Sequence, residues 1–404
     1  MSTYKKTKIV PQASHILYLI YTNPAAYPPL EHSSKIFSSL GCLISFFGIG
    51  ALGSADDMAF PENEQIIVRK LNYCPPGWRQ KIHFVFFGLW SIIWTLFVRP
   101  QWIYASDLLS TPAALAISFF ARSKLIYHEH DYPKELEEKQ LITRFTRWTL
   151  WCRCQVAKRA YLCILPNQKR ADIFRIETTA RGKVICVWNC PRRDEVRPPK
   201  ELEFGINPLR LAYHGSINSV RLPLTILNAM SKFVGRIHLS VVGYETIGNG
   251  RYMDCFLKHA GQLGLAESVD YVGTLATREA LLDAAAGCDV GLAFVPIVNA
   301  GVNHANMAGA SNKPFDYLAC RLALLVSDLP EWNSMFVNPG YGISCDPCDA
   351  SSLEAALLWL LENPEKVREM GYQGGERILR DWNYETQFEP VLFHMTETDV
   401  GFNP

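Results

Sequence analysis

Short apolar runs alternate with longer amphipathic segments along most of the chain. Runs of four to six residues that are almost free of charge have the length of buried strands, and continuous apolar runs are typical of parallel sheets covered by helices on both faces. Alternation with helical segments is the pattern of βα units. We therefore predict an α/β protein, with strands at 16–21, 42–47, 102–106, 124–127, 161–166, 183–188, 209–213, 238–242, 269–274, 290–294 and 322–326.

A polar, proline-punctuated stretch separates the two series of units. Pro198, Pro199 and Pro208 fall in it, and prolines interrupt both helices and central strands. A chain of 404 residues is long for one domain and of ordinary size for two. We predict domains at 1–195 and 209–380 joined by a linker at 196–208, with the segment 381–404 crossing back onto the first.

Charge is divided unevenly between the two halves. Residues 1–195 hold 25 Lys and Arg against 15 Asp and Glu, whereas the remainder holds 15 against 24. A basic half is expected to face an anionic partner such as a membrane surface, although chance asymmetry between domains is the alternative. Nucleic acid is not an expected partner. Twelve cysteines without disulfide spacing, and an N-terminus without an apolar signal region, predict a reduced cytoplasmic protein.

Two segments of the first half bear on a membrane. Residues 82–98 are uncharged and rich in aromatic and aliphatic side chains; we favour a buried helix over one that dips into a bilayer, because a spanning helix needs about 20 apolar residues. A second, basic stretch has no acid between Lys139 and Arg170, and it suits the interface of an anionic bilayer, or else a solvated helix with one face on the core. Its residues include Arg144, Phe145, Arg147, Trp148, Trp151, Arg153, Lys158 and Arg159.

A Gly-x-Gly-x-x-Gly pattern runs from Gly48 to Gly53 after a predicted strand. This pattern makes a nicotinamide-dependent oxidoreductase a rival. The residues that follow, Ser54 to Met58 and then Pro61, do not predict the helix whose N-terminus would meet a pyrophosphate. We interpret the pattern as a glycine-rich turn.

Titratable side chains follow two predicted strands of the first domain. Asp107 comes after 102–106, and His128, Glu129, His130 and Asp131 come after 124–127. Ligands of doubly wound sheets bind at the carboxyl ends of strands. Two adjacent turns rarely supply a full set of metal ligands, so we predict no metal site.

The loop at 22–32, which follows the first predicted strand, faces the same edge. Its last residues, Glu31 and His32, stand at the start of a helix predicted over 30–40. We expect both side chains to contact an acceptor.

The stretch from Gly309 to Asp316 predicts an anion site in the second domain. Gly309, Ala310 and Ser311 leave backbone N–H groups unobstructed, and a helix begins at Asn312 with Pro314 in its first turn. Unpaired amides and the helix dipole favour a phosphate there. Asp316 lies about one turn into the helix, where it can accept hydrogen bonds from a ribose. The alternative is an ordinary loop, helix and strand with a surface Asp.

Glycines and cations follow other strands of the second domain. Gly215, Ser216 and Arg221 come after 209–213, and a guanidinium suits a diphosphate because it donates two parallel hydrogen bonds. Lys313 is the candidate for a second positive charge. Gly243, Gly273 and Thr274 end two further strands, where a nucleotide base could stack on backbone.

The stretch Asn312-Lys-Pro-Phe-Asp-Tyr-Leu-Ala319 resembles the donor-site motif of glycosyltransferase family 4, retaining enzymes of the GT-B fold, in its Asn-Lys-x-Phe-Glu-Tyr-x-Ala form. The resemblance covers about 209–382. It implies two Rossmann-like domains facing across a cleft, nucleotide-sugar binding, and a ribose role for Asp316 as the second acid of a Glu-x7-Glu motif. The first acid is replaced by Ala308.

Two other turns carry the resemblance. Gly215 and Arg221 match the family's Gly-Arg-x4-Lys-Gly turn, whose first cation is replaced by Ser216. The strand end at His130 is similar to the family's Tyr-Asp-x-His-Asp/Glu, which implies that His130 meets the acceptor hydroxyl or the donor sugar. Asp107 resembles the acid of a His-x-His-Asp turn.

These inferences predict a hexosyltransferase-type enzyme that moves a sugar from a nucleotide-diphosphate sugar to an acceptor hydroxyl. The resemblance implies retention of configuration. We expect neither cofactor nor metal, because no Asp-x-Asp is present to hold one. His130 and Arg221 are the predicted catalytic residues, and Asp107, His128 and Asp131 are predicted to contact the acceptor.

The expected acceptor is a carbohydrate or a lipid-linked molecule of bacterial surface polysaccharide or glycolipid assembly. The expected location is cytoplasmic, peripheral on the inner face of the plasma membrane. Alternatives are a nucleotide-sugar epimerase of the same fold, a nicotinamide-dependent oxidoreductase using Gly48–Gly53, and an inactive membrane-binding scaffold.

Overall fold

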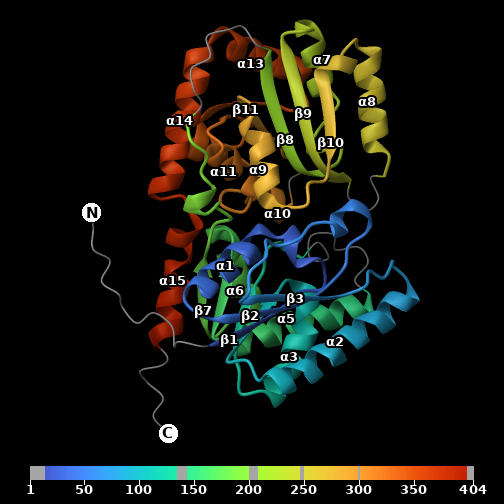
Figure 1. Cartoon of the computed structure of the whole chain (residues 1–404), viewed down its shortest axis with the longest axis vertical. Helices are drawn as coiled ribbons and strands as arrows, with labels where there is room; N and C mark the ends of the chain where they lie inside the picture. Colours follow the sequence, from blue (N-terminus) through green and yellow to red (C-terminus); the bar gives the residue numbers. More distant parts are fainter. Residues whose placement is uncertain (1–13, 134–142, 200–207, 246–249, 299–300, 398–404) are drawn as a thin grey trace. The chain divides into compact units, whose positions relative to one another are not determined.

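The computed structural model describes residues 14–133, 143–199, 208–245, 250–298 and 301–397 (Figure 1). The chain forms two compact units. Unit 1 comprises Met1–Asp56, Phe60–Trp188 and Tyr384–Pro404, and unit 2 comprises Asp57–Ala59 and Asn189–Asn383. The segment 189–195, predicted to close the first domain, therefore belongs to unit 2.

In the described residues, unit 1 is built on a seven-stranded parallel sheet in the order β3-β2-β1-β4-β5-β6-β7. The chain starts near the middle of the sheet and winds outwards in both directions, as in doubly wound folds. The strands are β1 (His15–Leu19), β2 (Leu43–Ile49), β3 (Ile66–Leu71), β4 (Trp102–Ser106), β5 (Lys124–His128), β6 (Leu162–Leu165) and β7 (Lys183–Cys186).

Helices cover both faces of this sheet because successive strand residues point to opposite sides. Ile16 and Tyr18 of β1 pack with α1 and α15 in one apolar cluster, whereas Leu17 and Leu19 pack with α3, α5 and α6 in another. The helices are α1 (Pro28–Ser39), α2 (Trp78–Val98), α3 (Thr111–Phe120), α5 (Arg144–Arg159), α6 (Gln168–Thr178) and α15 (Tyr384–Glu397).

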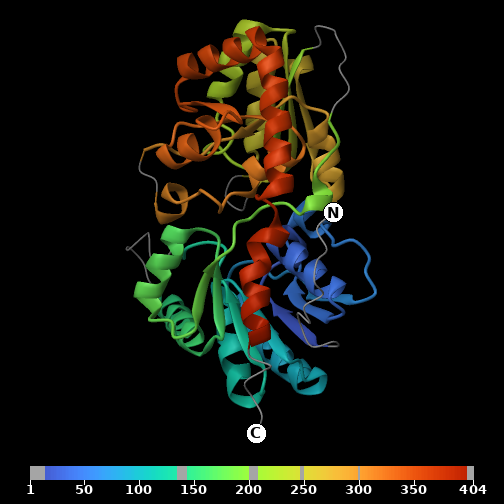
Figure 2. The same cartoon turned by 90° about the vertical axis from the view of Figure 1, so that its left-hand side faces the viewer.

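The C-terminal helix α15 completes unit 1. It lies over the sheet beside α1 (Figure 2), with the ring of Phe388 at 5.4 Å from that of Phe37. The hydroxyl of Tyr161 donates to the carbonyl oxygen of His394 at 2.8 Å. The last segment of the chain is therefore part of the first core.

Unit 2 is built, within the described residues, on a six-stranded parallel sheet in the order β10-β9-β8-β11-β12-β13. Its strands are β8 (Leu209–Ile217), β9 (Ile237–Glu245), β10 (Val269–Gly273), β11 (Val290–Ala293), β12 (Ala323–Ser327) and β13 (Gly342–Cys345). Its α-helices are α7 (Thr225–Met230), α8 (Tyr252–Gln262), α9 (Arg278–Ala286), α10 (Val302–Ala305), α11 (Asn312–Ala319), α12 (Pro330–Trp332), α13 (Ala350–Glu362) and α14 (Pro364–Arg380).

The glycine-rich pattern from Gly48 to Gly53 does not open an α-helix. Strand β2 ends at Ile49, and the next element is a 3-10 helix at Gly53–Asp56. A Cβ on Gly48 would lie 2.8 Å from Cδ of Pro24, so this glycine lets the loop before α1 pack closely on the strand. The context that a dinucleotide-binding fingerprint requires is therefore missing at this place.

The segment predicted as a buried helix at 82–98 forms most of α2, and the prediction is wrong for its outer face. Ile82, Leu89 and Phe97 are 61%, 54% and 78% exposed. By length and composition alone, α2 could cross a membrane. The run of apolar residues correctly predicted a helix, but it did not indicate which side of that helix faces the protein.

Candidate functional site

Glycines bring the strand ends of unit 2 close together. Gly215 of β8 and Gly243 of β9 lie opposite each other in the sheet register and have positive φ angles of 101° and 151°. A Cβ on Gly243 would lie 1.9 Å from the carbonyl oxygen of Gly215, so no larger residue fits. Thr274, directly after Gly273, donates from Oγ1 to the carbonyl oxygen of Gly243 at 3.4 Å. The structure therefore groups these predicted donor residues.

Two cations meet at the carboxyl end of β8. Nη1 of Arg221 donates to Oγ of Ser216. Nζ of Lys313 lies 3.0 Å from where a Cβ on Gly215 would stand, and 5.4 Å from the ring centroid of Tyr213. Burial, together with the positive charge of Arg221, lowers the pKa of Lys313 to about 7. The surroundings of Lys313 therefore disfavour its ammonium form, and an anion bound beside it would stabilise that form.

More of the backbone N–H groups in the loop before α11 are hydrogen-bonded within the protein than the sequence suggested. The N–H groups of Ala310 and Ser311 donate to the carbonyl oxygen of Met307 at 2.9 and 3.1 Å, so the prediction that both face an anion is wrong. The N–H groups of Asn312 and Lys313 remain candidates to bind an anion, since the first turn of a helix has no acceptor for them within the helix. The anion site at α11 is smaller than predicted.

Asn189 fastens this loop from the segment that joins the units. Its backbone N–H donates to the carbonyl oxygen of Gly309 at 2.7 Å, and its Nδ2 donates to that of Ala310 at 2.7 Å. Sequence reasoning placed Asn189 in the first domain and gave it no role. Its two hydrogen bonds hold the approach to α11 in one conformation.

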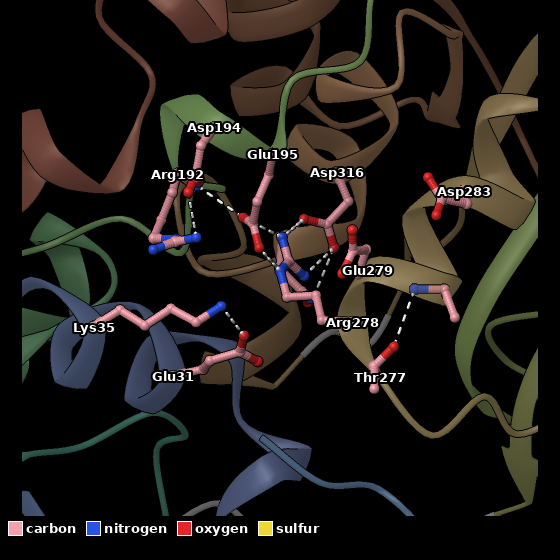
Figure 3. A network of polar contacts seen from close by, with 12 residues as sticks. Glu31, Lys35, Arg192, Asp194, Glu195, Thr277, Arg278, Glu279, Asp283 and Asp316 are labelled. Carbon is pink, nitrogen blue, oxygen red and sulfur yellow. Dashed lines mark hydrogen bonds and ion pairs between the residues drawn. The ribbon is translucent and has the colours of Figure 1, made fainter. Parts of the chain in front are cut away.

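Asp316 is fully buried and bound on both carboxylate oxygens. Nη2 of Arg278 donates to Oδ1 at 2.6 Å and Nη1 donates to Oδ2 at 3.2 Å, while Nδ2 of Asn312 donates to Oδ2 at 3.1 Å. Arg278 also donates to both carboxylate oxygens of Glu195, at 2.8 and 3.2 Å. Figure 3 shows this guanidinium between the two carboxylates. A ribose hydroxyl would therefore meet a carboxylate that already accepts three hydrogen bonds.

Arg278 is a site residue that sequence reasoning missed. It is the first residue of α9, whose N-cap Thr277 accepts from the N–H of Ala280. Burial would lower the pKa of Arg278, but Asp316 and Glu195 raise it well above its usual value, so the side chain stays charged. A buried carboxylate requires a cation as its partner, so the sequence could have indicated that some cation binds Asp316. It did not indicate that this cation is Arg278.

The predicted residues of unit 1 gather where β4 and β5 end. Oδ1 of Asp107 accepts from the N–H of His130 at 2.9 Å. Asp107 has a φ of 62°, which is unusual for a residue with a side chain. Burial, followed by the charge of Asp131, raises its pKa to about 8. The carboxyl group of Asp107 therefore holds a proton at neutral pH and anchors the turn that carries His130.

His128 and His130 form a buried pair of neutral rings, with centroids 3.9 Å apart. Nδ1 of His128 is 2.6 Å from the hydroxyl of Tyr104, and Nε2 of His130 is 2.9 Å from Oγ of Ser106. Burial lowers the pKa of His130 to about 3 and that of His128 well below its usual value. Among described residues, Nδ1 of His130 and Nε2 of His128 are both buried without a hydrogen-bond partner. Each ring therefore keeps one nitrogen that could meet a ligand.

The other predicted acceptor residues make contacts of their own. Glu31 pairs with Lys35 at 2.6 Å, and the ring of His32 packs against Tyr384 of α15 at 5.0 Å. Asp131 is exposed and lies 3.9 Å from Arg170. Within the described residues, no group of three or more His, Cys, Asp or Glu side chains could hold a metal ion.

The basic helix α5 has a buried cation among its exposed ones. Arg153 is 1% exposed and binds Glu129 through Nε at 2.6 Å and Nη2 at 2.7 Å, with Glu177 at 3.0 Å. The prediction that Arg153 faces lipid with the other cations of this helix is wrong. Glu129, which stands between the two histidines, is likewise held inside the fold.

Comparison with known proteins follows the same division of the chain. Residues 200–377 match the model of the family described as "Glycosyl transferases group 1". Among curated proteins, no sequence matches the chain.

Solved structures match nearly the whole length. Sucrose-phosphate synthase from Thermosynechococcus elongatus has a TM-score of 0.69 and 14% identity, and the match covers 96% of this chain and 98% of that one. Anabaena HepE in complex with UDP and glucose has a TM-score of 0.69 and 16% identity, covering 96% and 100%. WaaG, a glycosyltransferase involved in lipopolysaccharide biosynthesis, has a TM-score of 0.64 and 11% identity, covering 94% and 99%. These likenesses establish the two-domain GT-B fold.

Proposed function

We propose that this GT-B protein is a glycosyltransferase of the family 4 type, which transfers a sugar from a nucleotide-diphosphate sugar to an acceptor hydroxyl with retention of configuration. The observation that carries the proposal is the meeting of Arg221, Lys313 and the start of α11 around the Gly215 turn. Two cations and a helix N-terminus at the carboxyl end of a parallel sheet suit a diphosphate. The group 1 match over 200–377 covers this same arrangement.

In the proposed reaction, the bond between the anomeric carbon and the donor's β-phosphate oxygen breaks, and the acceptor oxygen bonds to that carbon on the same face. Arg221, Lys313 and the N–H groups of Asn312 and Lys313 stabilise the negative charge that develops on the leaving diphosphate. The acceptor's proton passes to a leaving phosphate oxygen. No step requires a metal ion or a cofactor.

We assign His130 to the acceptor. An imidazole whose pKa is about 3 is a weak base, so Nδ1 accepts a hydrogen bond from the acceptor hydroxyl and orients it rather than removing the proton. Ser106 on Nε2 and Asp107 on the backbone N–H hold the ring and its turn in place. Glu31, His32, His128 and Asp131 remain proposed contacts of the acceptor side.

We propose UDP-sugars as the first donors to test, because HepE is described in complexes with UDP and with UDP-glucose. Asp316, Gly243, Gly273 and Thr274 are the proposed contacts of the nucleoside. The proposed acceptor is a carbohydrate or lipid-linked molecule of bacterial surface polysaccharide or glycolipid assembly, and WaaG has this fold. The cations of α5 would hold the protein on anionic lipid at the inner face of the plasma membrane, more weakly as salt rises.

The test is a panel of nucleotide sugars examined by thermal shift, followed by turnover with each hit. A true donor raises the unfolding temperature by mass action. Release of nucleoside diphosphate that depends on an acceptor, with an α-linked product from an α-linked donor, would support the proposal. Stabilisation by no nucleotide sugar would refute it, and epimerised donor without acceptor consumption would assign an epimerase instead.

A further inference from the structure

Helix α2 exposes an apolar outer side, unlike an ordinary surface helix. Its inner side places Phe84, Phe87, Ser91 and Thr95 in the protein, although two of these residues are polar. Its outer side is apolar, and at about 100° per residue these positions form one stripe roughly 120° wide. The stripe consists of Ile82, Val85, Phe86, Leu89, Ile93, Leu96 and Phe97, each more than half exposed.

A helix that is apolar on all sides is normally buried in a core or surrounded by lipid. Helix α2 is in neither position in the isolated chain. It contacts α3 on one side (Figure 1), and the ring of Trp90 packs on that of Phe47 with centroids 4.7 Å apart. A contiguous exposed apolar stripe of this size marks an interaction surface rather than ordinary solvent contact.

The neighbouring helices extend the stripe and add charge. Phe119 and Phe120, at the end of α3, are 63% and 70% exposed. The guanidinium of Arg159, at the end of α5, lies 4.7 Å from the ring of Phe119. At the start of α5, the ring of Trp148 is 6.4 Å from that of Phe84. These three helices therefore form one surface.

This surface has a single sign of charge. None of α2, α3 and α5 contains an acidic residue, and between Gln65 and His128 the sequence has one, Asp107. Arg144, Arg147 and Arg159 of α5 are exposed, with Trp148 and Trp151 between them. Aromatic side chains and cations around an aliphatic stripe are what the boundary between anionic headgroups and acyl chains attracts.

We propose that α2 inserts its outer stripe into the acyl region of an anionic bilayer, lying parallel to the membrane plane, while the exposed cations of α5 contact the headgroups. This deepens the proposed membrane association and rests on it, not on the transfer chemistry. The helix does not span the bilayer, because Phe84, Phe87 and Trp90 hold it against the sheet of unit 1. Insertion adds a binding contribution that salt does not screen.

The experiment is co-sedimentation of the full chain with vesicles of neutral and anionic phospholipid, at low salt and at about 1 M NaCl, where charges are screened beyond about 3 Å. The test variant is Ile82→Gln, Leu89→Gln and Ile93→Gln, which leaves the inner side intact. The control carries the same number of apolar-to-Gln changes on other helices: Ile176→Gln, Leu358→Gln and Leu379→Gln, at 78%, 39% and 37% exposed. Thermal unfolding and UDP binding monitor the fold of each variant.

Wild type and control should stay bound at high salt, whereas the test variant should bind at low salt only and lose about a hundredfold in high-salt partitioning, because three side chains lose their transfer out of water. Complete release of the wild type by salt would refute insertion. So would salt-resistant binding of the test variant, or a wild-type dimer that the three glutamines convert to a monomer. Transfer to a water-soluble acceptor, assayed without vesicles, reports on the proposed function separately.

Discussion

Lys313 makes donor binding depend on pH in a way that can be measured. Its pKa is lowered to about 7 by burial and by Arg221, so much of the population is neutral at and above neutral pH. A diphosphate favours the charged ammonium, because an opposite charge within about 4–6 Å raises the pKa of a cation by one to three units. Binding of UDP should therefore be accompanied by proton uptake.

The size of the effect follows from the two pKa values. At pH 8, a group with a pKa of about 7 is roughly one-tenth protonated, and the same group raised to about 9 is roughly nine-tenths protonated. UDP binding should then take up about 0.8 proton at pH 8 and about 0.5 at pH 7, where the phosphates of UDP are mostly ionised. The dissociation constant should rise about fivefold between pH 7 and pH 8 by linkage.

Isothermal titration calorimetry with UDP in two buffers of different ionisation enthalpy measures the protons taken up. Lys313→Met removes the titrating group and Lys313→Arg keeps the site charged, so neither variant should take up a proton at pH 8. The bound phosphates are already ionised there and add little. Zero uptake by the wild type, or equal uptake by the wild type and Lys313→Met, would show that Lys313 does not face the diphosphate.

Three substitutions test the other proposed roles. Arg221→Ala should abolish transfer without lowering the unfolding temperature, and wild-type turnover in this variant would remove Arg221 from the site. Asp316→Ala should weaken UDP binding by calorimetry and destabilise unit 2 by about 3 kcal/mol in chemical unfolding, because Arg278 loses one of its two buried partners; unchanged UDP affinity would leave Asp316 a purely structural role. His130→Ala should lower kcat about a hundredfold with the donor affinity unchanged, because the acceptor hydroxyl is no longer oriented, and wild-type kcat would place the acceptor elsewhere.

The sequence predicted the order of most strands because burial on both faces leaves a run with no polar position. The bounds of β4 agree with the predicted 102–106. Strand β3 was not predicted, because it lies at the edge of the sheet, where Ile67, Val68 and Lys70 are exposed and the run is not uniformly apolar. Helix α2 was recognised but given the wrong surroundings, since an apolar run has the same composition whether protein or lipid covers it.

The candidate site likewise contains residues that the sequence could predict and residues that it could not. Residues at strand ends could be predicted, because parallel strands align their carboxyl ends, and this logic located Gly215, Gly243, Asp107 and His130. The partners of those residues lie on other elements of the same unit, far away in the sequence, and leave no local sequence signal. Asn189 donates hydrogen bonds to the carbonyl oxygens of Gly309 and Ala310, which are far from it in the sequence. The carbonyl oxygen of Met307 accepts from the N–H groups of Ala310 and Ser311, which were expected to face a phosphate.

Asp316 shows how a partner distant in the sequence changes the role expected for a residue. From the sequence, an acidic residue in the first turns of an amphipathic helix is expected to be available to a ligand. This expectation is the same for Asp316 as for the Glu of the family's motif. In the folded unit, its carboxylate is 0% exposed, so a cation must neutralise it, and Arg278 does so from the start of another helix. Because Arg278 also holds Glu195, the segment that enters unit 2 is tied to the start of α11 through one guanidinium. Loss of Asp316 should therefore disturb both the donor site and the entry of the chain into unit 2, which is why binding and stability have to be measured on the same variant.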